Sequence, residues 1–195
     1  MTKPRILAFA GSARQASFNR RLVEYAARLA DKAGATTTLI NLGDYPLPLF
    51  NQDEEREHGE PENAKNLKAL FREHSGLLIS APEYNSSITP LLKNTLDWVS
   101  RKSDDAAAMS AYAGKTAAII SASPGRLGGM RGLVHVRAIL NNLGVLVLPG
   151  QLCVAHAGKA FDDSGMLIDK HYRESLKNLT DRLITTLSEL RVSGS

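Results

Sequence analysis

The sequence predicts an α/β fold, a three-layer α/β/α sandwich around a five-stranded parallel sheet. Short apolar runs alternate along the chain with longer stretches whose apolar residues recur at helical spacing. The short runs are apolar throughout rather than at every second residue, which is typical of strands covered on both faces. A strand followed by a helix and a further strand favours a right-handed parallel crossover.

The elements follow in regular order. The predicted strands are Arg5 to Ala10, Thr36 to Ile40, Gly76 to Ser80, Thr116 to Ser121 and Val145 to Leu148. The predicted helices are Asn19 to Ala33, Pro61 to His74, Ile88 to Arg101, Met130 to Leu143 and Asp169 to Leu190. Asn41 to Glu60, polar and broken by Pro46 and Pro48, is expected to be a long loop, and Pro149 to Asp163 a second irregular stretch. Five strands suit the flavodoxin-like order 2-1-3-4-5, in which ligands bind at the carboxyl ends of the strands.

Length and composition favour one domain over residues 1–195, with 43% apolar and 23% charged residues. The net charge of +4 is modest and the basic residues are scattered, so we expect no nucleic-acid partner.

The apolar run at the N-terminus is too short for a signal or membrane segment, and Cys153 is the single cysteine. We therefore expect a cytoplasmic protein without membrane insertion. The five histidines lie far apart in sequence, which argues against a metal site.

The loop after the first strand has the composition of a phosphate site. It runs from Gly11 to Asn19 and leads directly into a helix, whose first amide groups and dipole favour an anion. The candidate donors are Ser12, Arg14, Ser17 and Asn19. Ser17 or Asn19 could equally serve as the helix N-cap, and capping is compatible with phosphate binding. The loop lacks the P-loop and dinucleotide-binding patterns.

The loop after the third strand carries a second group of candidates. Its residues Pro82, Glu83, Tyr84, Asn85 and Ser86 leave backbone amides and one aromatic ring free to meet a flat heterocycle. The alternative is structural, with Tyr84 capping the core and Asn85 forming an Asx turn. The order 2-1-3-4-5 places this loop beside the first one.

The loop after the fourth strand is rich in glycine. Ser123, Gly125, Gly128 and Gly129 precede a predicted helix, and the glycines allow positive φ angles and close backbone approach. Amides at this position would suit negative charge on a bound ligand. A plain strand-to-helix turn is the alternative.

Together the three loops resemble those of the NADPH-dependent FMN reductase family. The matching motifs are Gly-Ser-x-Arg-x-x-Ser-x-Asn at Gly11 to Asn19 and Pro-Glu-Tyr-Asn at Pro82 to Asn85, continued by Leu92-Lys93-Asn94 and Asp97-Trp98. Ser-Pro-Gly followed by Gly-Gly at Ser123 to Gly129 is similar to the third flavin loop of the family.

The resemblance implies an NAD(P)H-dependent oxidoreductase that binds FMN without a covalent bond. It assigns the FMN phosphate to Ser12, Arg14, Ser17 and Asn19, the isoalloxazine and ribityl chain to Pro82 to Ser86, and the opposite side to Ser123 and Gly125 to Gly129. A flavin, a quinone, an azo compound or a metal oxyanion would take the electrons, and a homodimer or homotetramer is expected. The cofactor carries the chemistry, so no catalytic side chain is expected.

Two points stay open at this stage. Arg126 or Arg131 could contact the 2′-phosphate of NADPH. A flavodoxin-type electron carrier, or a flavin-binding subunit without its own nicotinamide activity, is the alternative function. The positive net charge argues against a carrier, since such proteins are generally acidic.

Overall fold

Five parallel strands form a single sheet of order β2-β1-β3-β4-β5, which confirms the predicted topology. The structure is a computed structural model that describes residues 3–103 and 107–193. The strands are β1 (Arg5–Ala10), β2 (Thr36–Asn41), β3 (Gly76–Ser80), β4 (Thr116–Ala122) and β5 (Leu146–Val154). Apart from Arg5, every residue of the three central strands is buried, as their continuous apolar runs predict.

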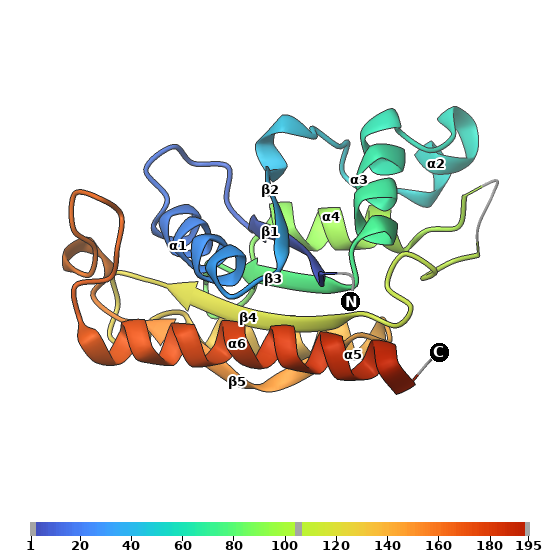
Figure 1. Cartoon of the computed structure of the whole chain (residues 1–195). Helices are drawn as coiled ribbons and strands as arrows, with labels where there is room; N and C mark the ends of the chain where they lie inside the picture. Colours follow the sequence, from blue (N-terminus) through green and yellow to red (C-terminus); the bar gives the residue numbers. More distant parts are fainter. Residues whose placement is uncertain (1–2, 104–106, 194–195) are drawn as a thin grey trace.

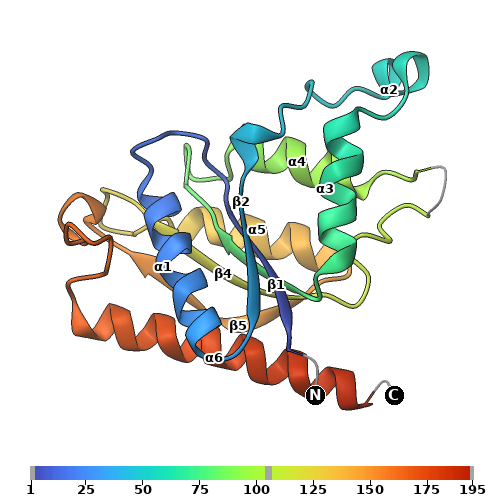
Figure 2. The ribbon, with the colours of Figure 1, turned by 45° about the horizontal axis from the view of Figure 1, so that its top comes forward.

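Helices cover both faces of the sheet, as the sandwich prediction requires (Figures 1 and 2). On one face lie α1 (Phe18–Lys32) and α6 (Lys170–Ser193), and on the other lie α3 (Glu62–Glu73), α4 (Pro90–Ser100) and α5 (Met130–Asn142). Alternate residues of β1 enter opposite cores: Ile6 and Ala8 pack with α1 and α6, and Leu7 and Phe9 with α3 and α4. Each predicted helix is present within a few residues of its expected bounds.

The expected irregular stretch Pro149 to Asp163 is wrong in its first part, because β5 continues to Val154. The pairing with β4 shifts between Ala117, which opposes Val147, and Ile119, which opposes Gln151. The extra residues on β5 form a bulge that contains Pro149 and Gly150. Proline is tolerated at a bulge on an edge strand, where it removes no inner ladder bond.

The expected loop Asn41 to Glu60 also contains helical segments, η1 (Leu42–Asp44) and α2 (Gln52–His58). Asn51 caps α2, three acidic residues occupy its first turn, and Arg56 and His58 lie in its last. This charge order suits the helix dipole. No residue of α2 is buried, so the apolar periodicity that predicts a helix is missing. A further short helix, η2 (Ala157–Lys159), follows β5.

Candidate functional site

The three candidate loops meet at the carboxyl edge of the sheet, because they follow the neighbouring strands β1, β3 and β4. We call them loop 1 (residues 11–17), loop 2 (residues 81–89) and loop 3 (residues 123–129). Figure 2 shows loops 1 and 2 side by side above the sheet. The hydroxyl of Thr89 donates to the carbonyl of Gly11 at 2.6 Å, which ties these two loops together.

Loop 1 presents two buried serines and an exposed arginine at the start of α1. Ser17 is the N-cap, and its oxygen accepts from the amide of Arg20 at 3.4 Å. The oxygen of Ser12 accepts from the amide of Arg14 at 3.4 Å. Both bonds are long, and within the described residues each hydroxyl hydrogen remains to be donated. The Arg14 side chain is exposed to solvent.

Asn19 differs from the other loop 1 candidates because its carboxamide turns into the protein. It is 4% exposed and bonds with Ser80 at the end of β3 and with Ala122 at the end of β4. The predicted capping role therefore falls to Ser17 alone.

Loop 2 forms a tight turn at its tip. Tyr84 and Ser87 exchange two backbone hydrogen bonds, while Asn85 and Ser86 have φ angles of 49° and 67°. Two successive positive φ angles define a type I′ turn. Tyr84 is 47% exposed, so the structural alternative, in which it caps the core, is wrong.

Glu83 fixes loop 2 to the start of α5. Its carboxylate accepts from Nε and a terminal nitrogen of Arg131 at 2.9 and 2.6 Å, and from the amide of Gly132 at 3.1 Å. Burial opposes ionisation, but these hydrogen bonds outweigh it and hold the pKa of Glu83 below its ordinary value. Arg131 is committed to this pair, which leaves Arg126 as the candidate for a nucleotide phosphate.

Loop 3 needs glycine at two consecutive positions. Gly128 has a φ of +60°, and a Cβ there would lie 2.8 Å from the carbonyl carbons of Cys153 and Val154. Gly129 has a φ of +92°, and a Cβ there would lie 2.8 Å from the side chain of Ser121. The backbone at Gly128 and Gly129 thus lies directly against β5 and the end of β4, which leaves no room for a side chain at either position.

Three buried hydroxyls that shape the site were not among the predicted residues. Ser80 bonds Asn19, Ser121 donates to the carbonyl of Gly128 at 2.6 Å, and Thr89 caps α4 while holding Gly11. The available signals were a serine ending or nearly ending two otherwise apolar strands, and Thr-Pro at a helix start.

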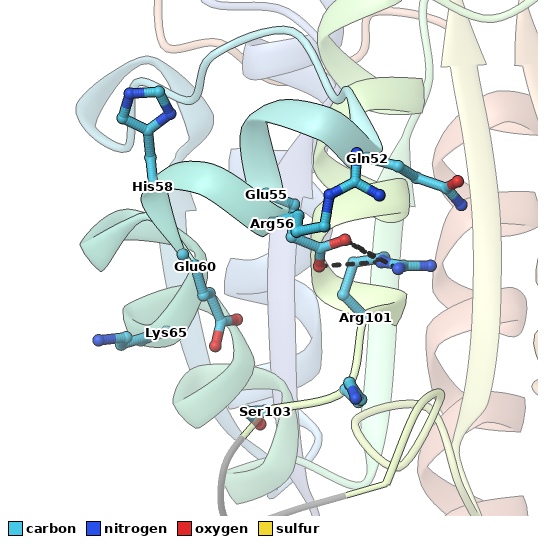
Figure 3. Close-up of a pocket in the computed structure, with 10 residues that line it drawn as sticks. Gln52, Glu55, Arg56, His58, Glu60, Lys65, Arg101 and Ser103 are labelled. Atoms are coloured by element: carbon cyan, nitrogen blue, oxygen red, sulfur yellow. Dashed lines mark hydrogen bonds and ion pairs between the residues drawn. The ribbon is translucent and has the colours of Figure 1, made fainter.

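A separate cavity lies between α2, α3 and the residues after α4. It measures about 850 Å³ and is shown in Figure 3. Glu55 there pairs with Arg101 at 2.8 Å, and both of its oxygens accept from Nε of Arg101 at 3.0 Å. Polar and charged side chains line this cavity and none of them belongs to loops 1, 2 or 3, so we do not assign it to the flavin.

The described residues contain no helix long and apolar enough to cross a membrane. They also contain no group of three or more His, Cys, Asp or Glu side chains that could hold a metal ion. Burial raises the pKa of Cys153, so its thiol is protonated at neutral pH.

Comparison with known proteins agrees with this geometry. Residues 4–159 match the family model described as NADPH-dependent FMN reductase. A quinone reductase of Pseudomonas putida is 38% identical over 176 residues, which cover 88% of each chain. A 2-hydroxy-1,4-benzoquinone reductase of a Burkholderia species is 31% identical over 189 residues, 96% of this chain and 98% of the relative.

Among solved structures, the flavoenzyme NAD(P)H:(acceptor) oxidoreductase FerB from Paracoccus denitrificans has the same fold. It superposes with a TM-score of 0.81 at 23% identity, covering 95% of this chain and 98% of that one. The family match spans most of the chain, and both relatives are more than 30% identical over most of its length. The chain therefore belongs to the NADPH-dependent FMN reductase family.

Proposed function

We propose that loops 1, 2 and 3 hold FMN without a covalent bond, that NAD(P)H reduces it, and that a quinone takes the electrons. The observation that carries this proposal is the convergence of the three loops at neighbouring strand ends beside the N-terminus of α1. This is where parallel α/β sheets bind their ligands. The protein acts as one domain.

The residues of loop 1 fit the phosphate of FMN. Ser12 and Ser17 supply hydroxyl donors, Arg14 supplies a permanent positive charge, and the start of α1 supplies backbone amides. Because Ser12 and Ser17 are 6% and 1% exposed, a phosphate bound there would be partly shielded from water. Shielding strengthens each charge-assisted hydrogen bond.

The residues of loops 2 and 3 fit the isoalloxazine ring and the ribityl chain. On one side lie Pro82, Glu83, Tyr84, Asn85 and Ser86, and on the other lie Ser123, Gly125, Gly128 and Gly129. Gly128 and Gly129 allow loop 3 to pack closely against β4 and β5, and the Glu83 bonds to Arg131 and Gly132 hold loop 2 close to the start of α5. When bound, FMN supplies a hydride acceptor that also delivers electrons. The protein's part is to bind, orient and shield.

Arg126 is our candidate for the 2′-phosphate of NADPH. It is exposed on loop 3, beside the proposed flavin site, and its guanidinium suits a phosphate. An Arg126→Ala variant that keeps the wild-type preference between NADPH and NADH would remove this assignment.

The choice of quinone as acceptor rests on the relatives named quinone reductases. The test is steady-state oxidation of NADPH by the FMN-loaded protein with a benzoquinone, free FMN, an azo dye or chromate as acceptor. We expect the highest kcat/KM with the quinone. A higher value with another acceptor would replace the quinone in this proposal.

We also propose that the protein is a cytoplasmic homodimer or homotetramer. An open groove of about 500 Å³ between α4 and α5 is lined largely by apolar groups, including Ile88, Pro90, Ala138 and Ile139. A second protomer covering it would bury this surface. Light scattering should give at least twice the chain mass, and a monomer would contradict the proposal.

The proposed cytoplasmic location rests on the cysteine content, because a single cysteine suits a reducing compartment.

A further inference from the structure

Asn19 makes a set of hydrogen bonds that a phosphate ligand does not require. Its Oδ1 accepts from the hydroxyl of Ser80 at 2.9 Å and from the amide of Ala122 at 3.0 Å, and its Nδ2 donates to the carbonyl of Ala122 at 2.8 Å. The side chain therefore pairs with residue 122 much as a neighbouring strand would. These partners fix which end of the carboxamide faces which group, because an amide must donate and a carbonyl must accept.

Asn19 lies in the first turn of α1, so its hydrogen bonds also affect the position of loop 1, which leads into that turn. Ser17 is the N-cap of α1, so Asn19 is the second helical residue and belongs to the turn whose amides face a bound anion. Its side chain fixes that turn against the ends of β3 and β4. The bonds to Ala122 span 103 residues of sequence, so they join loop 1 to the strand that leads into loop 3.

Ser80 is the part of this arrangement that cannot touch a ligand. It is fully buried at 0% exposure, at the end of an otherwise apolar strand, and its hydroxyl donates to Asn19. A buried hydroxyl without a partner would be unfavourable, and Asn19 supplies that partner. Any effect of Ser80 on ligand binding must therefore pass through Asn19 or the backbone.

We infer that Asn19 and Ser80 form a positioning pair that sets the first turn of α1 for the phosphate. Asn19 then acts on the phosphate mainly through the backbone it holds, rather than as a principal ligand. This inference rests on the proposed function, since it takes FMN as the ligand of loop 1.

The test is the affinity of Ser80→Ala for FMN and for riboflavin, which lacks the phosphate. Fluorescence titration should show FMN binding weakened about fivefold, the factor that corresponds to one net buried hydrogen bond. Riboflavin binding should be unchanged, so the Kd for riboflavin divided by the Kd for FMN should fall about fivefold. A general loss of stability would not move this ratio. In a background of Asn19→Ala, the Ser80→Ala change should add little, because the two side chains act as one unit.

Two controls complete the design. Thr180→Val removes another fully buried hydroxyl, which donates to the carbonyl of Lys177 in α6, away from the three loops. It should leave the binding of both flavins unchanged. Ser12→Ala, a direct ligand in our proposal, should weaken FMN binding whether Asn19 is present or replaced.

Several results would overturn the inference. FMN binding that is weakened by Asn19→Ala but not by Ser80→Ala would make Asn19 a direct ligand. Equal losses for FMN and riboflavin, or equal losses in Ser80→Ala and Thr180→Val, would also contradict it. Wild-type protein that fails to bind FMN would overturn the proposed function and this inference together, so the two failures are distinguishable.

Discussion

At the scale of single residues, Arg14 of loop 1 has the clearest proposed role, which is to place a positive charge beside the phosphate of FMN. Arg14 is exposed and lies between the two buried serines that open α1. A charge-assisted hydrogen bond contributes about 1.5–3 kcal/mol, so Arg14→Ala should weaken FMN binding by about ten- to a hundredfold. Riboflavin binding should change little. Arg182→Ala, on the exposed face of α6, is the matched control, and equal losses in the two variants would contradict the assignment.

Loop 3 allows a sharp test of backbone strain. Gly128→Ala places a Cβ 2.8 Å from backbone carbons of β5 at a φ of +60°. The left-handed conformation costs about 1–2 kcal/mol and overpacking about 1–3 kcal/mol, so the free energy of unfolding should fall by several kcal/mol. Urea denaturation measures it. Gly125→Ala, whose nearest neighbour is the Ser123 oxygen at 3.6 Å, should change it little. A Gly128→Ala variant as stable as Gly125→Ala would refute this account of the loop.

The residues of the candidate loops could be found from the sequence because each loop is contiguous. The side chains that join the loops could not, since their partners are distant. Asn19 and Ser80 are 61 residues apart, and Glu83 reaches Arg131 across 48 residues. Asn19 shows the limit most clearly, because its place in a motif suggests a ligand while its buried contacts suggest a positioning role.

At the scale of elements, α4 holds the segment after β2 in place. Asn94 accepts from the amide of Phe50 at 2.8 Å and donates to the carbonyl of Pro48 at 2.9 Å, and Trp98 donates to the same carbonyl at 2.8 Å. Asn94→Ala should speed hydrogen exchange at the Phe50 amide and cost about 1–2 kcal/mol of stability. Lys93→Ala, one residue away on the exposed face, should do neither. Unchanged exchange at Phe50 in Asn94→Ala would contradict this role.

The elements that the sequence predicted well are those whose burial matches their periodicity. The central strands and the five long helices carry apolar residues at the spacing that packing requires. The apolar periodicity does not predict α2, because none of its residues is buried. Its caps and the order of its charged residues are the features that indicate a helix there. The second half of β5 was missed because Pro149 and Gly150 normally end a strand, whereas a bulge absorbs them here.

At the scale of the whole molecule, a buried lysine makes stability depend on pH. Lys115 is 5% exposed, its ammonium donates to the carbonyl of His74 at 2.5 Å, and burial lowers its pKa from 10.5 to about 8. Between pH 8 and 10.5 the unfolded chain binds the proton more tightly than the folded chain. The free energy of unfolding should therefore rise with pH in this window.

Urea denaturation from pH 7.5 to 9.5 tests this dependence. The upper limit avoids Tyr112, whose burial raises its pKa and reverses the sign above pH 10. Lys115→Met should remove most of the rise, while Lys177→Met, on the exposed face of α6, should keep it. An equal rise in wild type and Lys115→Met would assign the effect to other groups.

The topology of the sheet brings together three loops that are separated in sequence by 63 residues (18–80) and 33 residues (90–122). The strand order could be predicted from the alternation of strands and helices, and it places loops 1, 2 and 3 at neighbouring positions. The family match identifies the class of cofactor that the protein uses. The central claim is that one bound FMN, held by all three loops, takes its electrons from a nicotinamide.

The most direct measurement is the visible absorption of the FMN-loaded protein after anaerobic addition of NADPH, and separately of NADH. We predict rapid loss of the oxidised flavin band with at least one nucleotide, and its return when a benzoquinone is added. A bound flavin that stays oxidised with both nucleotides would contradict the account and favour an electron carrier or a flavin-binding subunit.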